Sequence, residues 1–320
     1  MVFPGQGAQF VGMGQALVAA EPAARQAFSA ASAACGLDLD ALVRDGPPER
    51  LAETEVTQPA ILAVSLAVHA VLVQRGLRPR AVAGLSLGEY SALVAAGAAP
   101  LTDVAALVRR RGRYMQEAVP LGEGGMAAVL GLDGSGVERL CAAALQGLEG
   151  PEPAGGWVLA PANFNCPGQI VIAGHARALE AAVARGREFG ARRVAPLPVS
   201  APFHCRLMDP AARRLAPELQ ALDLRPAAVP VINNVAATPV ETPEDIRASL
   251  LAQVSSPVLW EDGVRRLGAL GCDTFVEVGP GKTLSTFIQR ILPEARVYAV
   301  CDPESLEAVL AACGAEDREG

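Results

Sequence analysis

The chain has 320 residues, of which 51% are hydrophobic and 19% are charged, and its formal net charge is −7. This length exceeds the usual size of one domain, about 100–200 residues, so we expect either one large α/β domain with an insertion or two domains. The negative charge argues against binding to nucleic acid or to a membrane surface, because both need a basic face.

The seven cysteines are scattered and form no C-x-x-C pair. We therefore expect free thiols in a reducing cytoplasm rather than disulfides or a zinc site. No group of His, Asp or Glu has metal-ligand spacing, so we expect no metal. The longest apolar run, residues 60–73, is shorter than the about 20 residues that span a bilayer. It predicts a buried helix that begins near Thr57 and Pro59. No signal peptide and no association motif are evident, and we expect a cytoplasmic monomer.

Short apolar runs typical of strands alternate with longer helical patterns along the chain. The expected strands cover residues 82–85, 126–132, 169–173, 195–199, 229–235 and 274–278. The expected helices begin at Ser86, at Asp103 with Thr102 as its cap, at Gly136 and at Ala176. This alternation favours an α/β fold with a largely parallel sheet.

The middle of the chain has a pattern of its own. Between residues 126 and 199, three expected strands alternate with two expected helices, 136–148 and 176–189. This β-α-β-α-β order indicates a small inserted subdomain of the split βαβ type.

Ser86 is the first candidate for chemistry. Gly84-Leu85-Ser86-Leu87-Gly88 matches G-x-S-x-G between an expected strand and an expected helix. The glycines allow a sharp turn that exposes the serine oxygen, and the helix N-terminus with the amide after the serine can stabilise an oxyanion. The alternative is a glycine-rich turn with a capping serine.

A nucleophilic serine needs a base, and the chain has three histidines. His69 lies inside the apolar helix, where a hydrogen-bonded core histidine is expected. His175 follows Gly174 in what we expect to be an exposed turn. His204 follows a strand, and loops after strands often carry catalytic groups in α/β proteins, although an exposed histidine at a helix start is equally compatible. No third acid is evident between Ser86 and His204.

Arg111 is the third candidate. The helix after Asp103 has one apolar face, and Arg111 lies on that face, whereas its arginine neighbours point elsewhere. A charge on a buried face is costly unless it is paired. A substrate carboxylate is a natural partner for the guanidinium; a structural salt bridge is the alternative. Two glycine-rich segments, Gly5-Gln6-Gly7 and Gly281-Lys282-Thr283, fail to match nucleotide-binding motifs.

Taken together, these residues resemble the malonyl-CoA:acyl carrier protein transacylases and the related acyltransferase domains of fatty acid and polyketide synthases. The matching segments occur in family order over nearly the whole chain. They are residues 3–9 (FPGQGAQ), 57–60 (TQPA), 84–93 (GLSLGEYSAL), 111–116 (RGRYMQ), 162–174 (ANFNCPGQIVIAG), 202–204 (PFH), 253–257 followed by Trp260, and 276–283 (VEVGPGKT). Leu85 stands where many members have histidine.

The resemblance implies a fold and a catalytic apparatus. It implies an α/β-hydrolase-like large domain of residues 1–121 and 196–320, with a mainly parallel sheet, and an inserted ferredoxin-like subdomain of residues 122–195. It implies Ser86 as nucleophile and His204 as base, oriented by the main-chain carbonyl at Gln253 in place of an acid. The oxyanion-hole amides are those of Gln6 and Leu87.

The resemblance also implies the residues that contact the substrate. Arg111 matches the arginine that holds the malonyl carboxylate, and Gln58 matches a glutamine that lines the site. Phe203, the bulky residue before the histidine, favours malonyl over methylmalonyl. Asn165 lies in a matching loop near the site and has no assigned role.

The implied reaction moves a malonyl group from malonyl-CoA to the phosphopantetheine thiol of holo acyl carrier protein, by a ping-pong route through malonyl-serine, in fatty acid synthesis. The coenzyme A thioester is a substrate, and no cofactor is expected. A discrete polyketide-type acyltransferase is the alternative, followed by a serine thioesterase or esterase and by a scaffold with a relic site. Carrier proteins are acidic, so a basic docking patch is expected from among Arg109, Arg110, Arg113, Arg192, Arg193 and Lys282.

Overall fold

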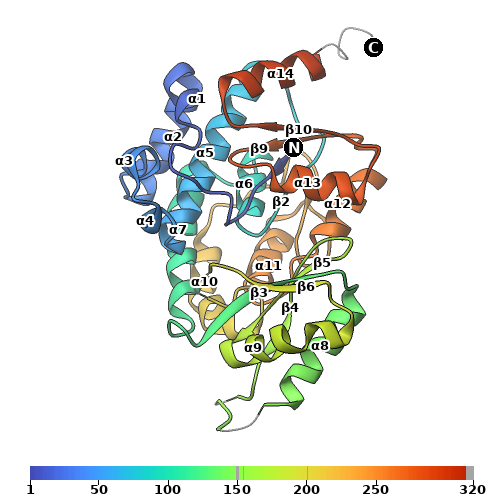
Figure 1. Ribbon diagram of the computed structural model, residues 1–320. Coiled ribbons are helices and arrows are strands. Elements are labelled where there is room, and N and C mark those ends of the chain that lie inside the picture. Colours follow the sequence, from blue (N-terminus) through green and yellow to red (C-terminus); the bar gives the residue numbers. More distant parts are fainter. Residues whose placement is uncertain (149–150, 154, 200, 315–320) are drawn as a thin grey trace.

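The computed structural model describes residues 1–148, 151–153, 155–199 and 201–314. The chain forms a large part built on a mainly parallel sheet and a smaller part with an antiparallel sheet, which lies at the bottom of Figure 1. The expected α/β class is confirmed.

The large sheet has six strands within the described residues, and β8 alone runs antiparallel to its neighbour. In spatial order they are β10 (Arg296–Val300), β9 (Thr274–Val278), β1 (Val2–Phe3), β2 (Val82–Gly84), β7 (Val231–Ile232) and β8 (Pro239–Val240). The chain moves outward from β1 through β2 and β7, and then returns to the other side of β1 with β9. Ligands of open α/β sheets bind beyond the carboxyl ends of the strands at such a reversal.

Successive residues of the central strands face two separate apolar cores. Phe3 and Val82 belong to the larger core, whereas their neighbours Val2 and Ala83 belong to a second core on the opposite face. This follows from the two-residue period of a strand, and it explains why the strands of a sheet covered on both faces are apolar throughout.

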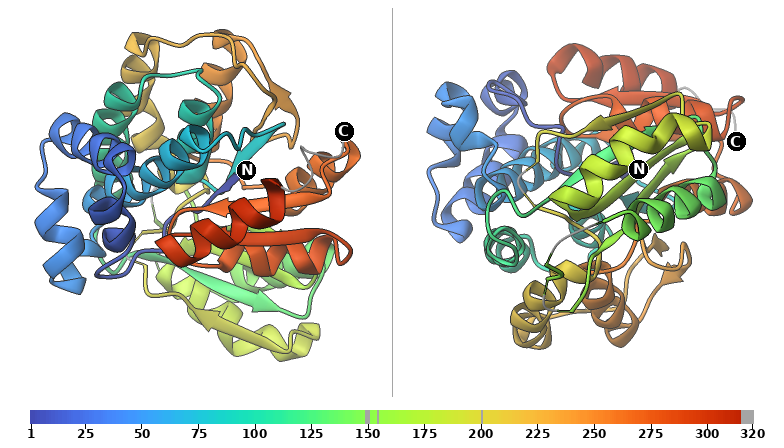
Figure 2. Two further views of the ribbon diagram at one scale, coloured as in Figure 1. Left: turned by 90° about the horizontal axis from the view of Figure 1, so that it is seen from above. Right: turned by 60° about the horizontal axis from the view of Figure 1, so that its bottom comes forward.

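Helices cover both faces (Figure 2). Those that contribute to the larger core are α1 (Gln15–Ala20), α2 (Pro22–Cys35), α3 (Leu39–Asp45), α4 (Pro48–Leu51), α5 (Thr54–Gln74), α6 (Leu87–Ala95), α7 (Leu101–Glu117), α10 (Asp209–Ala221), α11 (Pro243–Gln253) and α14 (Pro303–Gly314). The opposite face is covered by α12 (Trp260–Ala269) and α13 (Thr283–Ile291), and two short 3-10 turns are η1 (Gly186–Phe189) and η2 (Arg206–Met208).

Helix α5 is the one helix, within the described ranges, that is long and apolar enough to cross a membrane. Its apolar window is 83% buried inside the protein, which makes it the central helix of the larger core. The expected start near Thr57 and Pro59 is wrong, because α5 begins at Thr54 and includes Pro59. The expected cap of α7 is also wrong, since Pro100 is its N-cap residue and Thr102 lies inside the helix.

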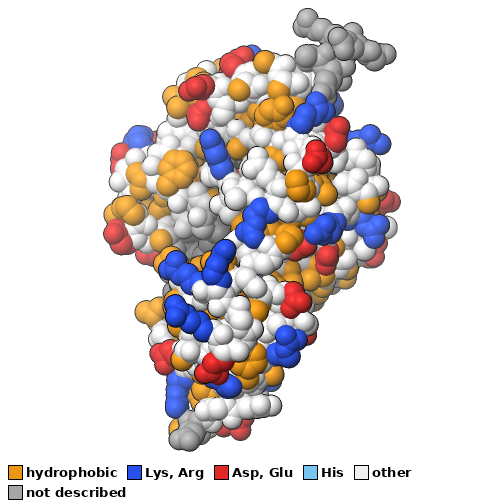
Figure 3. Space-filling model, turned by 45° about the vertical axis from the view of Figure 1, so that its right-hand side comes forward, with side chains coloured by type: hydrophobic (Ala, Val, Ile, Leu, Met, Phe, Trp, Pro, Cys, Tyr) orange, Lys and Arg blue, Asp and Glu red, His pale blue; other side chains and the backbone are white. Residues whose placement is uncertain are grey.

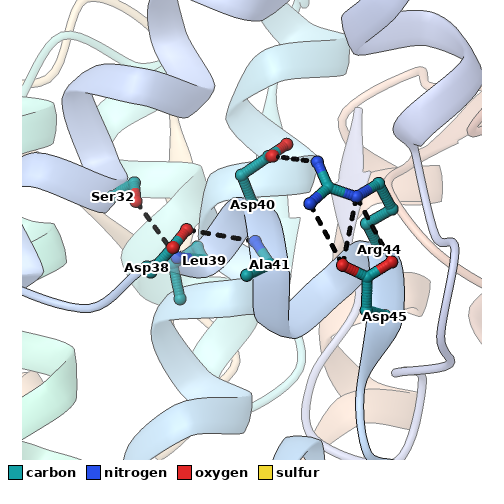
Figure 4. Close-up of polar contacts among 7 residues, drawn as sticks. All are labelled: Ser32, Asp38, Leu39, Asp40, Ala41, Arg44 and Asp45. Carbon is teal, nitrogen blue, oxygen red and sulfur yellow. Dashed lines mark hydrogen bonds and ion pairs between the residues drawn. The ribbon is translucent and has the colours of Figure 1, made fainter.

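The N-terminal helices are delimited by their end residues. Helix α2 begins at Pro22 and ends before Gly36, whose φ of 67° is a conformation that glycine adopts without strain. The Asp38 side chain accepts a hydrogen bond from the Ala41 amide and thereby caps α3, as Figure 4 shows. In the last turn of α3, Arg44 pairs with acidic neighbours on the exposed surface (Figure 4).

The smaller part has the ferredoxin-like order β-α-β-β-α-β. Its strands, in spatial order, are β4 (Leu159–Cys166), β5 (Gln169–His175), β3 (Gly124–Leu130) and β6 (Arg193–Pro196), and all neighbouring pairs are antiparallel. Helices α8 (Gly134–Gln146) and α9 (Ala176–Arg185) cover one face (Figure 2). Strand β4 is absent from the expected elements. The division of the chain at residues 122–195 stays a prediction.

Strand β4 joins the two parts. The Val258 amide donates to the Ala162 carbonyl, and the Phe164 amide donates to the Val258 carbonyl, each at 2.9 Å. The segment before α12 therefore pairs with β4, and the smaller part is held close to the carboxyl edge of the large sheet.

Candidate active site

Ser86 occupies a sharp turn between β2 and α6. Its φ of 53° is uncommon for a residue other than glycine and indicates a strained backbone. The turn requires glycine on both sides: a Cβ on Gly84 would lie 1.9 Å from the Gly88 carbonyl carbon, and a Cβ on Gly88 would lie 2.0 Å from the Phe3 oxygen. The close approach of backbone to backbone is the physical reason for the G-x-S-x-G spacing.

His204 lies between Ser86 and Gln253. Its Nε2 is 2.7 Å from the Ser86 Oγ, and its Nδ1 is 2.9 Å from the Gln253 main-chain oxygen. A carbonyl only accepts hydrogen bonds, so Nδ1 carries the proton and Nε2 is free to accept from the serine hydroxyl. Burial, together with the charge of Arg111, lowers the pKa of His204 to about 4. The imidazole is therefore neutral at pH 7, as a base must be.

Arg111 is 1% exposed, in agreement with its expected place on the buried face of α7. Its Nη1 donates to the Gln58 Oε1 at 2.9 Å, and its Nη2 donates to the Gln253 Oε1 at 3.0 Å and to the Ser86 Oγ at 3.2 Å. Burial lowers its pKa, yet a guanidinium stays charged in proteins. These bonded partners are all uncharged, so the cation retains the capacity to bind an anion.

Gln6 and Leu87 follow β1 and β2 at the carboxyl edge of the sheet, and both line the same pocket as Ser86. The Leu87 amide is the first of α6, where an α-helix offers no internal acceptor. The Gln6 side chain donates to the Thr54 Oγ1 at 3.3 Å, which fixes the loop that presents its amide.

The pocket encloses about 200 Å³ between the two parts of the molecule. Seven of the eight expected site residues line it, and Gln253 lies behind it, against His204 and Arg111. The lining residues from the expected set are Gln6, Gln58, Ser86, Leu87, Arg111, Phe203 and His204. The smaller part contributes Met126, Asn163, Asn165 and Val171, and α13 contributes Thr283, Leu284 and Phe287.

Two residues that support the site have no assigned role in the sequence analysis. The Asn234 Oδ1 accepts from the Ser86 amide at 2.7 Å, and its Nδ2 donates to the Gly84 carbonyl at 2.7 Å, so Asn234 braces the serine turn. Glu89 is buried and accepts hydrogen bonds from the Asn234 amide and from the Gln253 Nε2. Asn234 stood unassigned within the expected strand 229–235, and Glu89 stood unassigned within the serine motif.

The other two histidines lie away from this pocket. The Nε2 of His69 is buried without a partner, so the expectation of a hydrogen-bonded histidine is wrong. His175 ends β5 and is half-buried, and its Nδ1 accepts from the Val158 amide; the expected exposed turn is wrong too. No group of three His, Cys, Asp or Glu side chains in the described part of the chain is arranged to hold a metal ion.

Comparison with known proteins agrees with this geometry. The family model for the acyl transferase domain matches residues 1–303. A malonyl CoA-acyl carrier protein transacylase of Escherichia coli K12 is 45% identical over 97% of both chains. The crystal structure of an acyl carrier protein S-malonyltransferase from Vibrio cholerae superposes with a TM-score of 0.91 at 46% identity, covering 96% of this chain and 98% of that one.

A third relative was solved with a partner. It is a malonyl-transacylase in complex with a type II PKS acyl-carrier protein, with a TM-score of 0.92 and 42% identity over 98% of both chains. The chain therefore belongs to the acyltransferase family that includes the malonyl CoA-acyl carrier protein transacylases.

Proposed function

We propose that this chain transfers the malonyl group of malonyl-CoA to holo acyl carrier protein. The observation that carries the proposal is the buried Arg111 guanidinium, which lies 3.2 Å from the Ser86 Oγ and is bonded only to uncharged groups. A site with a nucleophile and a buried cation this close together suits an acyl group that bears its own carboxylate. The names of the relatives support the same donor and acceptor.

The first half-reaction begins at the Ser86–His204 pair. His204 takes the hydroxyl proton through Nε2, and the Ser86 Oγ attacks the thioester carbonyl carbon. The Gln253 carbonyl holds the imidazole in the required tautomer and stabilises the imidazolium as it forms. The Gln6 and Leu87 amides bind the oxyanion, each contributing about 3–4 kcal/mol to transition-state stability. The carbon–sulfur bond then breaks, coenzyme A leaves with the proton from His204, and malonyl-serine remains.

The second half-reaction reverses these steps with a different thiol. His204 takes the proton of the phosphopantetheine thiol, the sulfur attacks the malonyl ester, and Ser86 regains its proton. Each proton transfer uses the same imidazole, so the mechanism requires no metal and no cofactor, and the coenzyme A thioester is a substrate. We take the protein to be a cytoplasmic monomer, in which one pocket binds the coenzyme A thiol and the phosphopantetheine thiol in turn.

Selectivity among acyl groups depends on two features, the presence of a free carboxylate and the absence of a branch. An acetyl group leaves Arg111 without an anion, and loss of such a buried pair typically costs about 2–5 kcal/mol. Phe203, which lines the pocket next to His204, restricts the space for a branched acyl group and favours malonyl over methylmalonyl.

Docking of the carrier protein requires basic surface near the pocket. Figure 3 shows Lys and Arg side chains gathered across the middle of one face. Among the six candidates, Lys282, Arg113, Arg192 and Arg193 are exposed, and Lys282 directly precedes the pocket residue Thr283. Arg109 donates to the Cys35 carbonyl and Arg110 pairs with Glu218, so both are engaged within the fold.

A discrete acyltransferase of polyketide synthesis is the second candidate, and the relative solved with a PKS carrier protein favours it. The two candidates share the chemistry and differ in the carrier. Kinetic assays with malonyl-CoA and with carrier proteins of the two pathways test both: we expect transfer to exceed hydrolysis, with the higher kcat/KM for the fatty acid carrier. Hydrolysis that is unaffected by either carrier would indicate a thioesterase instead.

A further inference from the structure

Glu89 is a buried carboxylate beneath the nucleophile. It lies on α6 three residues after Ser86 and is 1% exposed. Its Oε2 accepts from the Asn234 amide at 3.0 Å and from the Gln253 Nε2 at 2.8 Å, and its Oε1 accepts from the Ser249 hydroxyl at 3.4 Å. These partners are uncharged, although a buried carboxylate normally requires a cation nearby.

The cation is Arg111, and the Gln253 side chain connects the two charges. The Gln253 Oε1 accepts from the Arg111 Nη2 at 3.0 Å, while the Gln253 Nε2 donates to the Glu89 Oε2 at 2.8 Å. An arginine only donates and a carboxylate only accepts, so the two charges together determine which way the amide points. The main-chain oxygen of the same glutamine orients His204.

Above pH 7, the site thus contains one buried cation and one buried anion. Among the described side chains, Arg111 on α7 and Tyr90 on α6 are the charged or titratable groups coupled to Glu89; those that face it from α11 and from the 233–234 turn are uncharged. The malonyl carboxylate brings a second anion to the same guanidinium. Two carboxylates that share one cation in a medium of low dielectric cannot both stay ionised without a large cost, and one of them takes a proton.

We propose that Glu89 is the resting counter-charge of Arg111 and takes up a proton from solvent when the substrate carboxylate binds there. Glu89 is thus a positioning residue that acts through Gln253, and loading of the site is coupled to proton uptake. This inference rests on the proposed function, since it takes malonyl-CoA as the donor.

The electrostatics of the site support proton uptake by Glu89. Burial raises the pKa of Glu89 to about 7, against which its hydrogen bonds and Arg111 act. A second anion at Arg111 raises this pKa further, because it neutralises the charge that favours the ionised form. Near pH 6 the Glu89 carboxyl is already largely protonated, so proton uptake on binding is small. Near pH 8 it is ionised before the donor binds and must gain a proton on binding.

The test is calorimetric titration of the Ser86→Ala protein, which binds the donor without reacting. Repeating the titration in buffers with different ionisation enthalpies gives the number of protons taken up. With malonyl-CoA we expect uptake to approach about one proton per site near pH 8, and the dissociation constant to rise about tenfold per pH unit above the pKa of Glu89. Acetyl-CoA, which has no acyl carboxylate, should show neither effect.

Two further variants in the Ser86→Ala background separate charge from packing. Glu89→Gln preserves shape and can satisfy the same neighbours, because the Ser249 hydroxyl can accept as well as donate; proton uptake and pH dependence should vanish while binding persists. Ser249→Ala removes a partner but not the charge, and uptake should remain.

Binding of malonyl-CoA to Ser86→Ala without proton uptake near pH 8 would overturn the inference, as would full uptake in the Glu89→Gln protein. If Glu89→Gln does not fold, the pH dependence of affinity in Ser86→Ala alone still decides the matter. Failure of the proposed function is recognised separately, because the wild-type protein would then not be malonylated by malonyl-CoA at any pH.

Discussion

The Nδ1 of His204 lies 2.9 Å from the main-chain carbonyl oxygen of Gln253. The group that orients the imidazole is therefore part of the backbone, and no side-chain substitution at position 253 removes it. This arrangement accounts for the absence of an acid partner in the sequence pattern. It also divides the role of Gln253 in two, since its side chain bonds to Arg111 and Glu89 independently.

Replacement of Gln253 by alanine should therefore impair acylation only in part. The substitution preserves the carbonyl and removes hydrogen bonds to two charged groups. A net transition-state loss equal to one such bond, about 1.5–3 kcal/mol, lowers kcat/KM for malonyl-CoA about 10- to 100-fold. Stopped-flow measurement of acylation, with Ser86→Ala as the inactive reference, checks this. A loss as complete as that of Ser86→Ala would show that the side chain, and not the carbonyl, sustains the base.

Replacement of Arg111 by alanine should reverse the acyl preference. The malonyl carboxylate loses its partner, and kcat/KM for malonyl-CoA should fall by about 100-fold or more, whereas acetyl-CoA should lose far less. Arg113→Ala, which removes an exposed arginine from the same helix, is the matched control and should leave the ratio of the two substrates unchanged. Equal losses for both substrates in Arg111→Ala would contradict a carboxylate-binding role.

The pH dependence of kcat/KM should report the unusual environment of His204. The pKa of the free enzyme's base governs the acid limb, and burial together with Arg111 lowers it to about 4 from the ordinary value of 6.5. Activity per folded molecule should thus persist well below pH 6. A steady-state profile, with folding monitored by circular dichroism at each pH, measures this. An acid limb near 6.5 would mean that the imidazole is solvated or paired with an anion.

The same His204 shift makes the fold sensitive to acid. A histidine whose pKa is lower in the folded state binds fewer protons there than in the unfolded state. The free energy of unfolding is therefore highest above pH 6.5 and falls as the pH drops from 6.5 towards 4. Denaturant unfolding at a series of pH values should show a steeper loss over this window in the wild type than in His204→Gln. Identical slopes would contradict the neutral, buried state.

The turn around Ser86 should tolerate no side chain at its glycines. Gly84→Ala places a Cβ 1.9 Å from the Gly88 carbonyl carbon, and backbone cannot yield as a flexible side chain does. We expect a loss of at least about 1–3 kcal/mol of unfolding free energy. Gly125→Ala, where the nearest atom is a leucine methyl at 3.4 Å, is the control and should cost far less. Denaturant unfolding measures both, and equal stability of the two variants would contradict the packing argument.

The sequence predicted those features that depend on local pattern. The serine turn follows from glycine spacing, and the burial of Arg111 follows from its place on the apolar face of α7, which the structure confirms. The resemblance to a family added the expectation that His204 and Gln253 meet at Ser86, although 118 and 167 residues separate them from it. No periodicity within one segment contains such information.

Other features could not be predicted from the sequence, for physical reasons. Strand β4 contains Pro161 and two register shifts, so its sequence lacks the regular alternation of a strand. Asn234 and Glu89 function through contacts with each other and with Gln253, and a pattern in one segment cannot reveal a partner in another. Helix α5 begins at Thr54, before its proline, although local preference places proline in the first turn of a helix.

The central claim is that Ser86 carries the malonyl group between two thiols. Intact-protein mass spectrometry after brief exposure to malonyl-CoA, followed by addition of holo acyl carrier protein, tests it most directly. We predict a malonyl adduct on the wild-type chain that is absent from Ser86→Ala, and whose loss is matched by malonylation of the carrier. A folded wild-type protein without an adduct, or an adduct that is discharged only to water, would contradict the account.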